Sequence, residues 1–272
     1  MQFLGLTIYQ GKYQDFLKLI KNPTRKTLVF TPNPEILLRA SKDEEFRVLL
    51  SQADYLTPDA NGLYVGAIMQ EGKSFLFAGL QTFFSRKNLQ MQYGELISWS
   101  NLTKDLFDIA QKECKKILII DSYRITNPEN GFEIRKKQIQ EKLPELFREQ
   151  FPSLTVQILF NGEEYPEQIA HSIIQENISY VFSCIGMKSQ EQILVDIWRY
   201  LPDSQRVVGL GVGSSIDYLL GLQKRAPAVM QKFWLEWLYR LILEPQKRWK
   251  RIWDALIEFP RMVRKNRGIL LK

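Results

Sequence analysis

The alternation of short apolar runs with helix-length segments most narrows the folds that this chain can adopt. Runs rich in β-branched and aromatic residues predict strands at Thr27–Thr31, Ala53–Thr57, Ser74–Leu80, Lys116–Asp121, Leu154–Phe160, Ser179–Ile185 and Arg206–Val212. Helical patterns lie between them at Pro34–Leu50, Asn101–Lys115, Gly131–Gln150 and Gln190–Tyr200. Because hairpin signals are few, this order favours an α/β fold with a mainly parallel, Rossmann-like sheet flanked by helices. We expect Met1–Gly11 to form a first strand rather than a signal peptide.

Charge divides the chain near residue 221. Residues 222–272 hold 13 Lys and Arg against 4 Asp and Glu, whereas residues 1–221 hold 24 against 26. Four of the six tryptophans also lie in the C-terminal part. The sequence therefore predicts an α/β body at 1–221 and a basic, aromatic, helical appendage at 222–272. Nucleic acid is a weaker interpretation of this charge, because no recognition motif accompanies it.

Polar residues follow two of the predicted strands at the points where those strands end. The stretch "TPNPE" places Thr31 and Asn33 after the first strand, and "TPDANG" places Asp59 and Asn61 after the second. Open α/β sheets bind ligands at the carboxyl ends of their strands, so these four residues are candidate site residues. Capping of the helices that follow is the alternative, because Asn and Asp are preferred N-caps.

A glycine-containing loop, "GLGVGSSID", follows the last predicted strand. Gly211 and Gly213 permit close approach of a ligand to the backbone, and a helix start attracts phosphate. A simple tight turn fits the same residues. The loop lacks the third glycine of a dinucleotide-binding fingerprint, which disfavours a nucleotide-dependent oxidoreductase.

The appendage contains two amphipathic patterns. The first runs over Val229–Ile242, and packing against the core is its alternative interpretation. The second follows Pro245 and places Trp249 and Trp253 beside several Lys and Arg residues. Such a helix suits the surface of an anionic bilayer, and Pro260 is expected to end it.

Three stretches resemble the WecG/TagA/CpsF family of bacterial glycosyltransferases. "TPNPEILLRASKDEEFRVLLSQADYLTPDANGL" is similar to its T-x-N-P-E and A-D-x-x-x-P-D-G-x-G segments. "CIGMKSQEQ" is similar to its G-x-P-K-Q-E-x-W stretch. The most specific match is "GVGSSIDYLLGLQKRAPAVMQKFWLEWLYRLILEPQKRWKR", which carries R-A-P and L-E-W-L-Y-R-L-I at the family's spacing.

The resemblance implies an inverting transferase that moves an N-acetylmannosamine-type sugar from a UDP donor to a polyprenyl-diphosphate-linked saccharide. It implies that Asp59 is the general base and that Thr31 and Asn33 support it. The residues that it implies for substrate binding, together with those from the loops above, are Asn61, Gln190, Glu191, Gly211, Gly213, Arg225, Arg240, Arg248 and Arg251. No Asp-x-Asp pair is present, so we expect neither a metal nor another cofactor.

The chain departs from the family pattern in places. The family's E-R-V-T-G-x-D segment, which supplies an arginine, reads "ELISWSN" here, and about twenty extra residues that contain Arg86 precede it. A catalytically silent homologue that binds nucleotide-sugar or lipid-linked saccharide as an assembly partner is therefore the alternative function. Cys114 and Cys184 lie far apart in the sequence, which fits a reducing cytoplasm. Together with the basic appendage, this predicts a peripheral protein on the inner face of the cell membrane. Whether the chain forms a homo-oligomer stays open.

Overall fold

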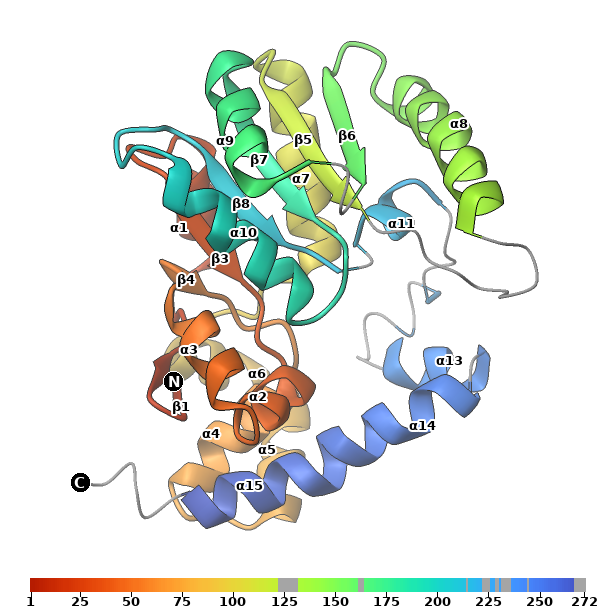
Figure 1. Ribbon diagram of the computed structural model, residues 1–272. Helices are drawn as coiled ribbons and strands as arrows, with labels where there is room; N and C mark the ends of the chain where they lie inside the picture. Colours follow the sequence, from red (N-terminus) through yellow and green to blue (C-terminus); the bar gives the residue numbers. More distant parts are fainter. Residues whose placement is uncertain are drawn as a thin grey trace.

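Six parallel strands form the central sheet in the computed structural model of this chain, in the order β4-β3-β8-β7-β5-β6 (Figure 1). Their bounds are Thr27–Phe30 (β3), Tyr55–Leu56 (β4), Lys116–Asp121 (β5), Val156–Phe160 (β6), Ile178–Ser183 (β7) and Val208–Gly211 (β8). The structure describes residues 1–121, 132–160, 164–213, 215–221, 226–227, 230, 236–243 and 245–266. The predicted α/β fold with a mainly parallel sheet is confirmed.

Helices surround this sheet and extend beyond its β4 edge. The helices of the N-terminal half are Tyr13–Lys21 (α1), Pro34–Ala40 (α2), Glu44–Ser51 (α3), Gly62–Gln70 (α4), Phe75–Phe84 (α5), Arg86–Tyr93 (α6) and Trp99–Lys112 (α7). Those that follow are Phe132–Gln150 (α8), Pro166–Gln175 (α9), Ser189–Tyr200 (α10), Ser215–Leu219 (α11), Glu236–Leu243 (α13), Pro245–Trp253 (α14) and Phe259–Asn266 (α15).

Side chains of the central strands alternate between two cores, one on each face of the sheet. On β5, Leu118 and Ile120 join the core that contains α9 and α10, whereas Ile117 and Ile119 join the core that contains α1 and α7. This is the period of two expected of a strand, with both of its faces covered by helices. The near-continuous apolar run that predicted this strand is the consequence of that double burial.

The stretch Ser74–Leu80 was predicted as a strand, and this prediction is wrong. It forms most of α5, and the hydroxyl of Ser74 accepts a hydrogen bond from the N–H of Phe77 at 3.2 Å, which caps the helix. A short apolar run without alternation does not distinguish a strand from a helix. The helix satisfies its backbone groups internally, and of its side chains only Ala78 is buried.

Two further elements differ in detail from the prediction. The N-terminal segment begins with an antiparallel hairpin of Gln2–Phe3 (β1) and Leu6–Thr7 (β2), and Ile8 directly after it forms a parallel bridge with Leu56 of β4. Leu4 and Gly5 both have positive φ at its two-residue turn, as tight hairpins require. The predicted helix Pro34–Leu50 is broken into α2 and α3, because Asp43 caps a new helix start by accepting from the N–H of Phe46.

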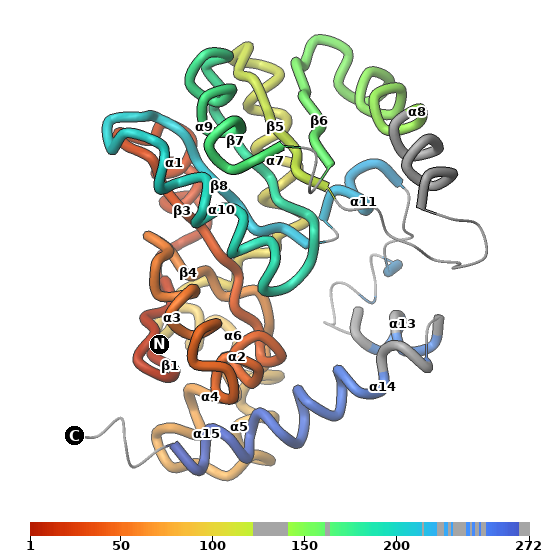
Figure 2. The backbone as a smooth tube through the Cα atoms, in the orientation of Figure 1, coloured from red at the N-terminus to blue at the C-terminus, as the bar shows by residue number. Residues whose placement is uncertain are grey.

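The C-terminal helices run back across the N-terminal part of the chain (Figure 2). A π-helical segment, Asp254–Glu258, joins α14 to α15, so Pro260 does not end the helical stretch. Proline lacks a backbone N–H, and its place beside a turn where the regular ladder is already shifted reduces the cost. Phe259 is fully buried against Phe3 and the backbone of Gly66 on α4. Within the described residues, no helix is both long and apolar enough to cross a bilayer.

Candidate functional site

The carboxyl ends of β3 and β8 mark the position in the sheet where a ligand crevice is expected. These strands are parallel neighbours, yet the helices that follow them lie on opposite faces. Ile36 and Leu37 of α2 belong to one core, and Ile216 of α11 belongs to the other. Adjacent parallel strands whose following loops diverge in this way leave a crevice outside their carboxyl ends.

The two polar loops predicted from the sequence contact each other. β3 and β4 are paired in parallel, so their carboxyl ends lie at the same edge of the sheet. A Cβ atom at Gly62 would lie only 2.5 Å from Cγ of Pro34, so the two loops meet where glycine has no side chain. This contact brings the loop that carries Thr31 and Asn33 against the loop that carries Asp59.

Helix capping accounts for one of the candidate residues but not for another. The Oδ1 atom of Asn33 accepts a hydrogen bond from the N–H of Ile36 at 2.9 Å, and so caps α2. Asn61 occupies the N-cap position of α4, but its side chain makes no capping hydrogen bond. Thr31 is buried directly after β3, whereas Asp59 and Asn61 are half-buried.

The loop that carries Asp59 is held by hydrogen bonds that the sequence did not reveal. Thr57 is fully buried, its N–H donates to the carbonyl of Phe30 at 2.9 Å, and its hydroxyl accepts from the indole N–H of Trp99 at 3.2 Å. The N–H of Ile97 donates to the carbonyl of Pro58 at 2.7 Å. The segment that replaces the family's E-R-V-T-G-x-D therefore supports the backbone next to Asp59.

Gln190 and Glu191 form a buried polar link between α10 and the glycine loop. The amide of Gln190 donates to the carboxylate of Glu191 at 2.7 Å and accepts from the N–H of Gly213 at 3.1 Å. The other oxygen of Glu191 accepts from the N–H of Lys188 at 2.7 Å. Glu191 is fully buried, and this burial raises the pKa of its carboxyl group. The Gln190–Glu191 pair therefore holds the glycine loop in position, and these hydrogen bonds are made to groups within the protein.

The glycine loop itself combines a packed position with an open one. A Cβ at Gly211 would lie 3.1 Å from the Gln190 amide nitrogen, whereas one at Gly213, where φ is +54°, would meet no atom of the described residues within 4 Å. The neighbouring strand ends at Ser183, whose buried hydroxyl has no hydrogen-bond partner among the described residues. Among the described residues, the loop therefore combines an uncrowded position at Gly213 with a neighbouring polar atom that has no hydrogen-bond partner.

One cation of the appendage pairs with the start of α2. The guanidinium of Arg251 on α14 forms an ion pair at 2.8 Å with Glu35 in the first turn of α2. Glu35 was not singled out from the sequence, although it stands in the same N-P-E stretch as Asn33. Arg240 and Arg248 lie on α13 and α14, and Arg225 lies outside the described residues.

Arg86 lies next to the divergent segment that begins at Glu95. Burial lowers the pKa of its guanidinium, and both Glu95 and Tyr64 are close enough to act on it electrostatically. Glu95 also accepts from the N–H of Tyr13 at 2.8 Å, and the hydroxyl of Tyr64 donates to the carbonyl of Gly94 at 2.6 Å. The structure therefore places this arginine beside the segment in which the family's arginine is missing.

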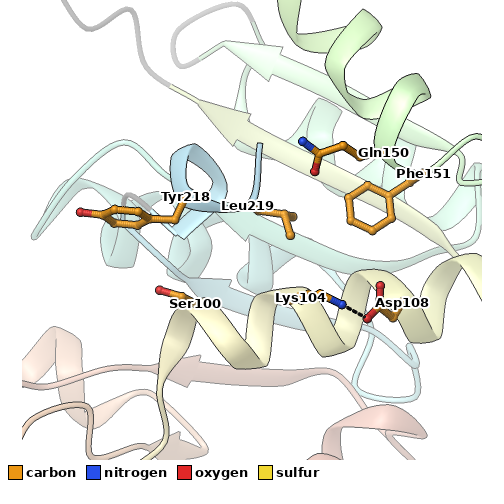
Figure 3. Close-up of a pocket in the computed structure, with 7 residues that line it drawn as sticks. All are labelled: Ser100, Lys104, Asp108, Gln150, Phe151, Tyr218 and Leu219. Atoms are coloured by element: carbon orange, nitrogen blue, oxygen red, sulfur yellow. Dashed lines mark hydrogen bonds and ion pairs between the residues drawn. The ribbon is translucent and has the colours of Figure 1, made fainter. Parts of the chain in front are cut away.

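A separate hollow lies between α7 and α11 (Figure 3). It has a volume of about 340 Å³. Its lining consists of Ser100, Lys104, Asp108, Gln150, Phe151, Tyr218 and Leu219. Lys104 and Asp108 form an ion pair at 2.5 Å along α7, and none of the lining residues was a predicted site residue.

Known proteins resemble this chain over most of its length. The sequence model of the glycosyl transferase WecG/TagA/CpsF family matches residues 1–83 and 131–269. An N-acetylglucosaminyldiphosphoundecaprenol N-acetyl-beta-D-mannosaminyltransferase from Bacillus subtilis (strain 168) is 26% identical over 226 residues, 83% of this chain and 74% of that protein. A protein with the same name from Staphylococcus aureus (strain NCTC 8325 / PS 47) is 23% identical over 232 residues, 84% of this chain and 75% of that protein.

Proposed function

The chain belongs to the WecG/TagA/CpsF family of glycosyl transferases, and from this premise we propose that it transfers an N-acetylmannosamine-type sugar. The donor is a UDP-sugar, and the acceptor is a saccharide linked through diphosphate to a polyprenyl chain. The relatives named for N-acetylglucosaminyldiphosphoundecaprenol support this acceptor class. The product belongs to the synthesis of a cell-surface polysaccharide.

The observation that carries the proposal is the contact of the two polar loops at the edge of the crevice. Pro34 and Gly62 meet, so the loop that carries Asp59 lies against the loop that carries Asn33, and β3 lies beside the strand that leads to the glycine loop. A carboxylate can accept the proton of an acceptor hydroxyl, and a helix start and a glycine loop can bind the diphosphate of a donor. Core packing or helix capping alone would not explain why a carboxylate, a helix start and a glycine loop follow neighbouring strands at the same edge of the sheet.

In the proposed reaction the carboxylate of Asp59 accepts the proton of the acceptor hydroxyl. The hydroxyl oxygen forms the new bond to the anomeric carbon while the bond from that carbon to the diphosphate oxygen breaks, and UDP leaves with the electron pair. A single displacement of this kind inverts the configuration. Arg251 carries positive charge to the crevice edge, where a guanidinium can stabilise the departing diphosphate. The sequence has no Asp-x-Asp pair, so we assign this charge to arginine rather than to a metal.

We further propose that the chain works at the inner face of the cell membrane, because its acceptor stays in the bilayer. The described part of the appendage presents exposed cations at Lys250, Arg261, Arg264 and Lys265. Trp249 and Trp253 are also exposed there. Each Lys or Arg near an anionic surface contributes about 1 kcal/mol of attraction.

The test is transfer from a panel of UDP-sugars to a water-soluble, short-chain analogue of the diphosphate-linked acceptor. Asp59→Asn should lower turnover by roughly 10²–10⁴-fold, the contribution of a positioned base, and leave UDP affinity nearly unchanged. Asp54→Asn is the matched control, because Asp54 pairs with Arg25 and accepts from the N–H of Leu28 at the amino end of β3. Binding of UDP without transfer would favour the catalytically silent assembly partner, and wild-type turnover in Asp59→Asn would remove Asp59 from the mechanism.

A further inference from the structure

Helix α5 and the last turn of α6 expose an apolar surface that the candidate site does not use. Leu76, Phe77, Leu80, Phe83 and Phe84 on α5 and Met91 on α6 are exposed, and we call these six residues the α5 face. Phe75, which is 37% exposed, lies outside it. Leu76 is 72% exposed and Phe84 is 77% exposed, values far above those expected of a packing surface. The family match ends at residue 83 and resumes at 131, so this element lies at the edge of the shared sequence.

The α5 face is one continuous side of the helix. At about 100° per residue, its five α5 residues fall within an arc of roughly 120°, and the buried Ala78 falls on the opposite side. Ala78 and its neighbours pack on α4, so the helix is fixed with its large side chains turned outward. An arc of that width matches the apolar side of a helix that lies in a membrane interface.

The charges around the α5 face indicate what covers it. Between Gly72 and Gly94 the chain contains Lys73, Arg86 and Lys87 and no carboxylate. The ammonium of Lys73 lies 5.7 Å from the centre of the Phe77 ring, and Lys87 is exposed. Exposed lysines next to an aromatic surface, with no carboxylate in the same stretch, are complementary to anionic headgroups above acyl chains. In a symmetric dimer through this face, the same cations of two copies would be brought together.

The position of α5 also suits a lipid-linked substrate. The amino end of α4 carries Gly62 at the crevice, and its carboxyl end leads to α5, roughly 13 Å further along at 1.5 Å per residue. α15, with its exposed cations, packs on the same helix α4, at the same end of the molecule (Figure 1). We propose that the α5 face inserts into the surface of an anionic bilayer and holds the crevice near its membrane-bound acceptor, an inference that rests on the proposed function.

The test measures sedimentation of the full-length protein with vesicles of phosphatidylcholine containing phosphatidylglycerol. Replacement of Leu80, Phe83 and Phe84 by serine should weaken binding by roughly tenfold or more, because three large apolar side chains no longer enter the interface. The matched control replaces three apolar residues exposed elsewhere, Leu19, Val48 and Ile174, by serine and should bind as the wild type does. All replaced side chains are exposed, so the melting temperature should change little.

Two further arms separate the α5 face from its alternatives. The double variant Lys73→Gln and Lys87→Gln keeps the apolar residues and should bind with a weaker dependence on salt, since fewer charges are screened. Neutralising Arg261, Arg264 and Lys265 measures how much of the vesicle binding is due to the appendage. These three cations are unchanged in the α5 serine variant. Unchanged vesicle binding in that serine variant would overturn the proposal. Conversion of a wild-type dimer to a monomer without loss of vesicle binding would assign the α5 face to a second copy instead.

Activity distinguishes this proposal from the proposed function. The α5 serine variant should transfer sugar to a water-soluble acceptor at the wild-type rate, and should lose transfer only to acceptor embedded in vesicles. If the wild type transfers sugar to neither acceptor but binds vesicles through the α5 face, the proposed function fails and the membrane surface stands.

Discussion

Replacement of Gln190 by methionine tests whether the buried link beneath the glycine loop has the role that its geometry indicates. Methionine has a similar length and volume, so the change removes hydrogen-bonding groups without opening a large cavity. Gln190 is 4% exposed, and its amide joins Glu191 on α10 to the N–H of Gly213. Both partners would lose a hydrogen bond at a position that water reaches poorly.

The size of the effect follows from the two bonds. A neutral hydrogen bond such as that from Gly213 contributes about 0.5–1.5 kcal/mol, and leaving the buried carboxyl oxygen of Glu191 without its partner costs about 1–3 kcal/mol. Since the two bonds share one side chain and are not strictly additive, we expect Gln190→Met to lower the free energy of unfolding by about 2–4 kcal/mol. The glycine loop loses its anchor to α10, so UDP affinity should fall as well.

Urea unfolding at neutral pH measures the first effect, and calorimetric titration with UDP measures the second. Gln192→Met is the matched control, because the Gln192 side chain is exposed on the same helix and, among the described residues, bonds only Asp196. Its free energy of unfolding should change by no more than about 0.5 kcal/mol. If the two variants lost equal stability, the buried link would not be what holds the loop, and the reasoning would be refuted.

Two other perturbations test the packing of the appendage and the titration of the buried carboxyl. Phe259→Ala should lower the free energy of unfolding by about 3–5 kcal/mol, because it removes a fully buried ring that packs on Phe3 and α4. Leu256→Ala is the control and should lower it far less, because the Leu256 side chain is 45% exposed. Burial raises the pKa of Glu191 above 4.5, its value in the unfolded chain, so folding binds a proton and the contribution of this group declines as pH rises through that range. Urea unfolding at several values between about pH 4 and pH 8 should therefore show Glu191→Gln gaining stability relative to wild type as pH increases, and a pH-independent difference would contradict it.

The sequence alone predicted the class of the fold and the positions of the six strands of the main sheet to within two residues at each end. Runs such as Lys116–Asp121 are buried on both faces of the sheet, so almost all of their residues are apolar and the strand can be recognised from the local sequence. The polar residues after β3 and β4 were readable for the same reason, because the end of an apolar run locates a strand terminus. Local signals were insufficient for Ser74–Leu80, because its uniform apolar run fits either a strand or a helix. A serine at the start of such a run, here the N-cap Ser74, does not by itself distinguish the two.

Tertiary structure decided which of these termini lie together. The contact between Pro34 and Gly62 depends on the pairing of β3 with β4, and the pair of Glu35 with Arg251 joins residues 216 positions apart. Neither follows from spacing along the chain, because strand order and helix docking are set by burial of complementary surfaces over the whole domain. The α5 face shows the same division, since its sequence predicts only that the residues are apolar, whereas packing of Ala78 on α4 fixes which of them face outward.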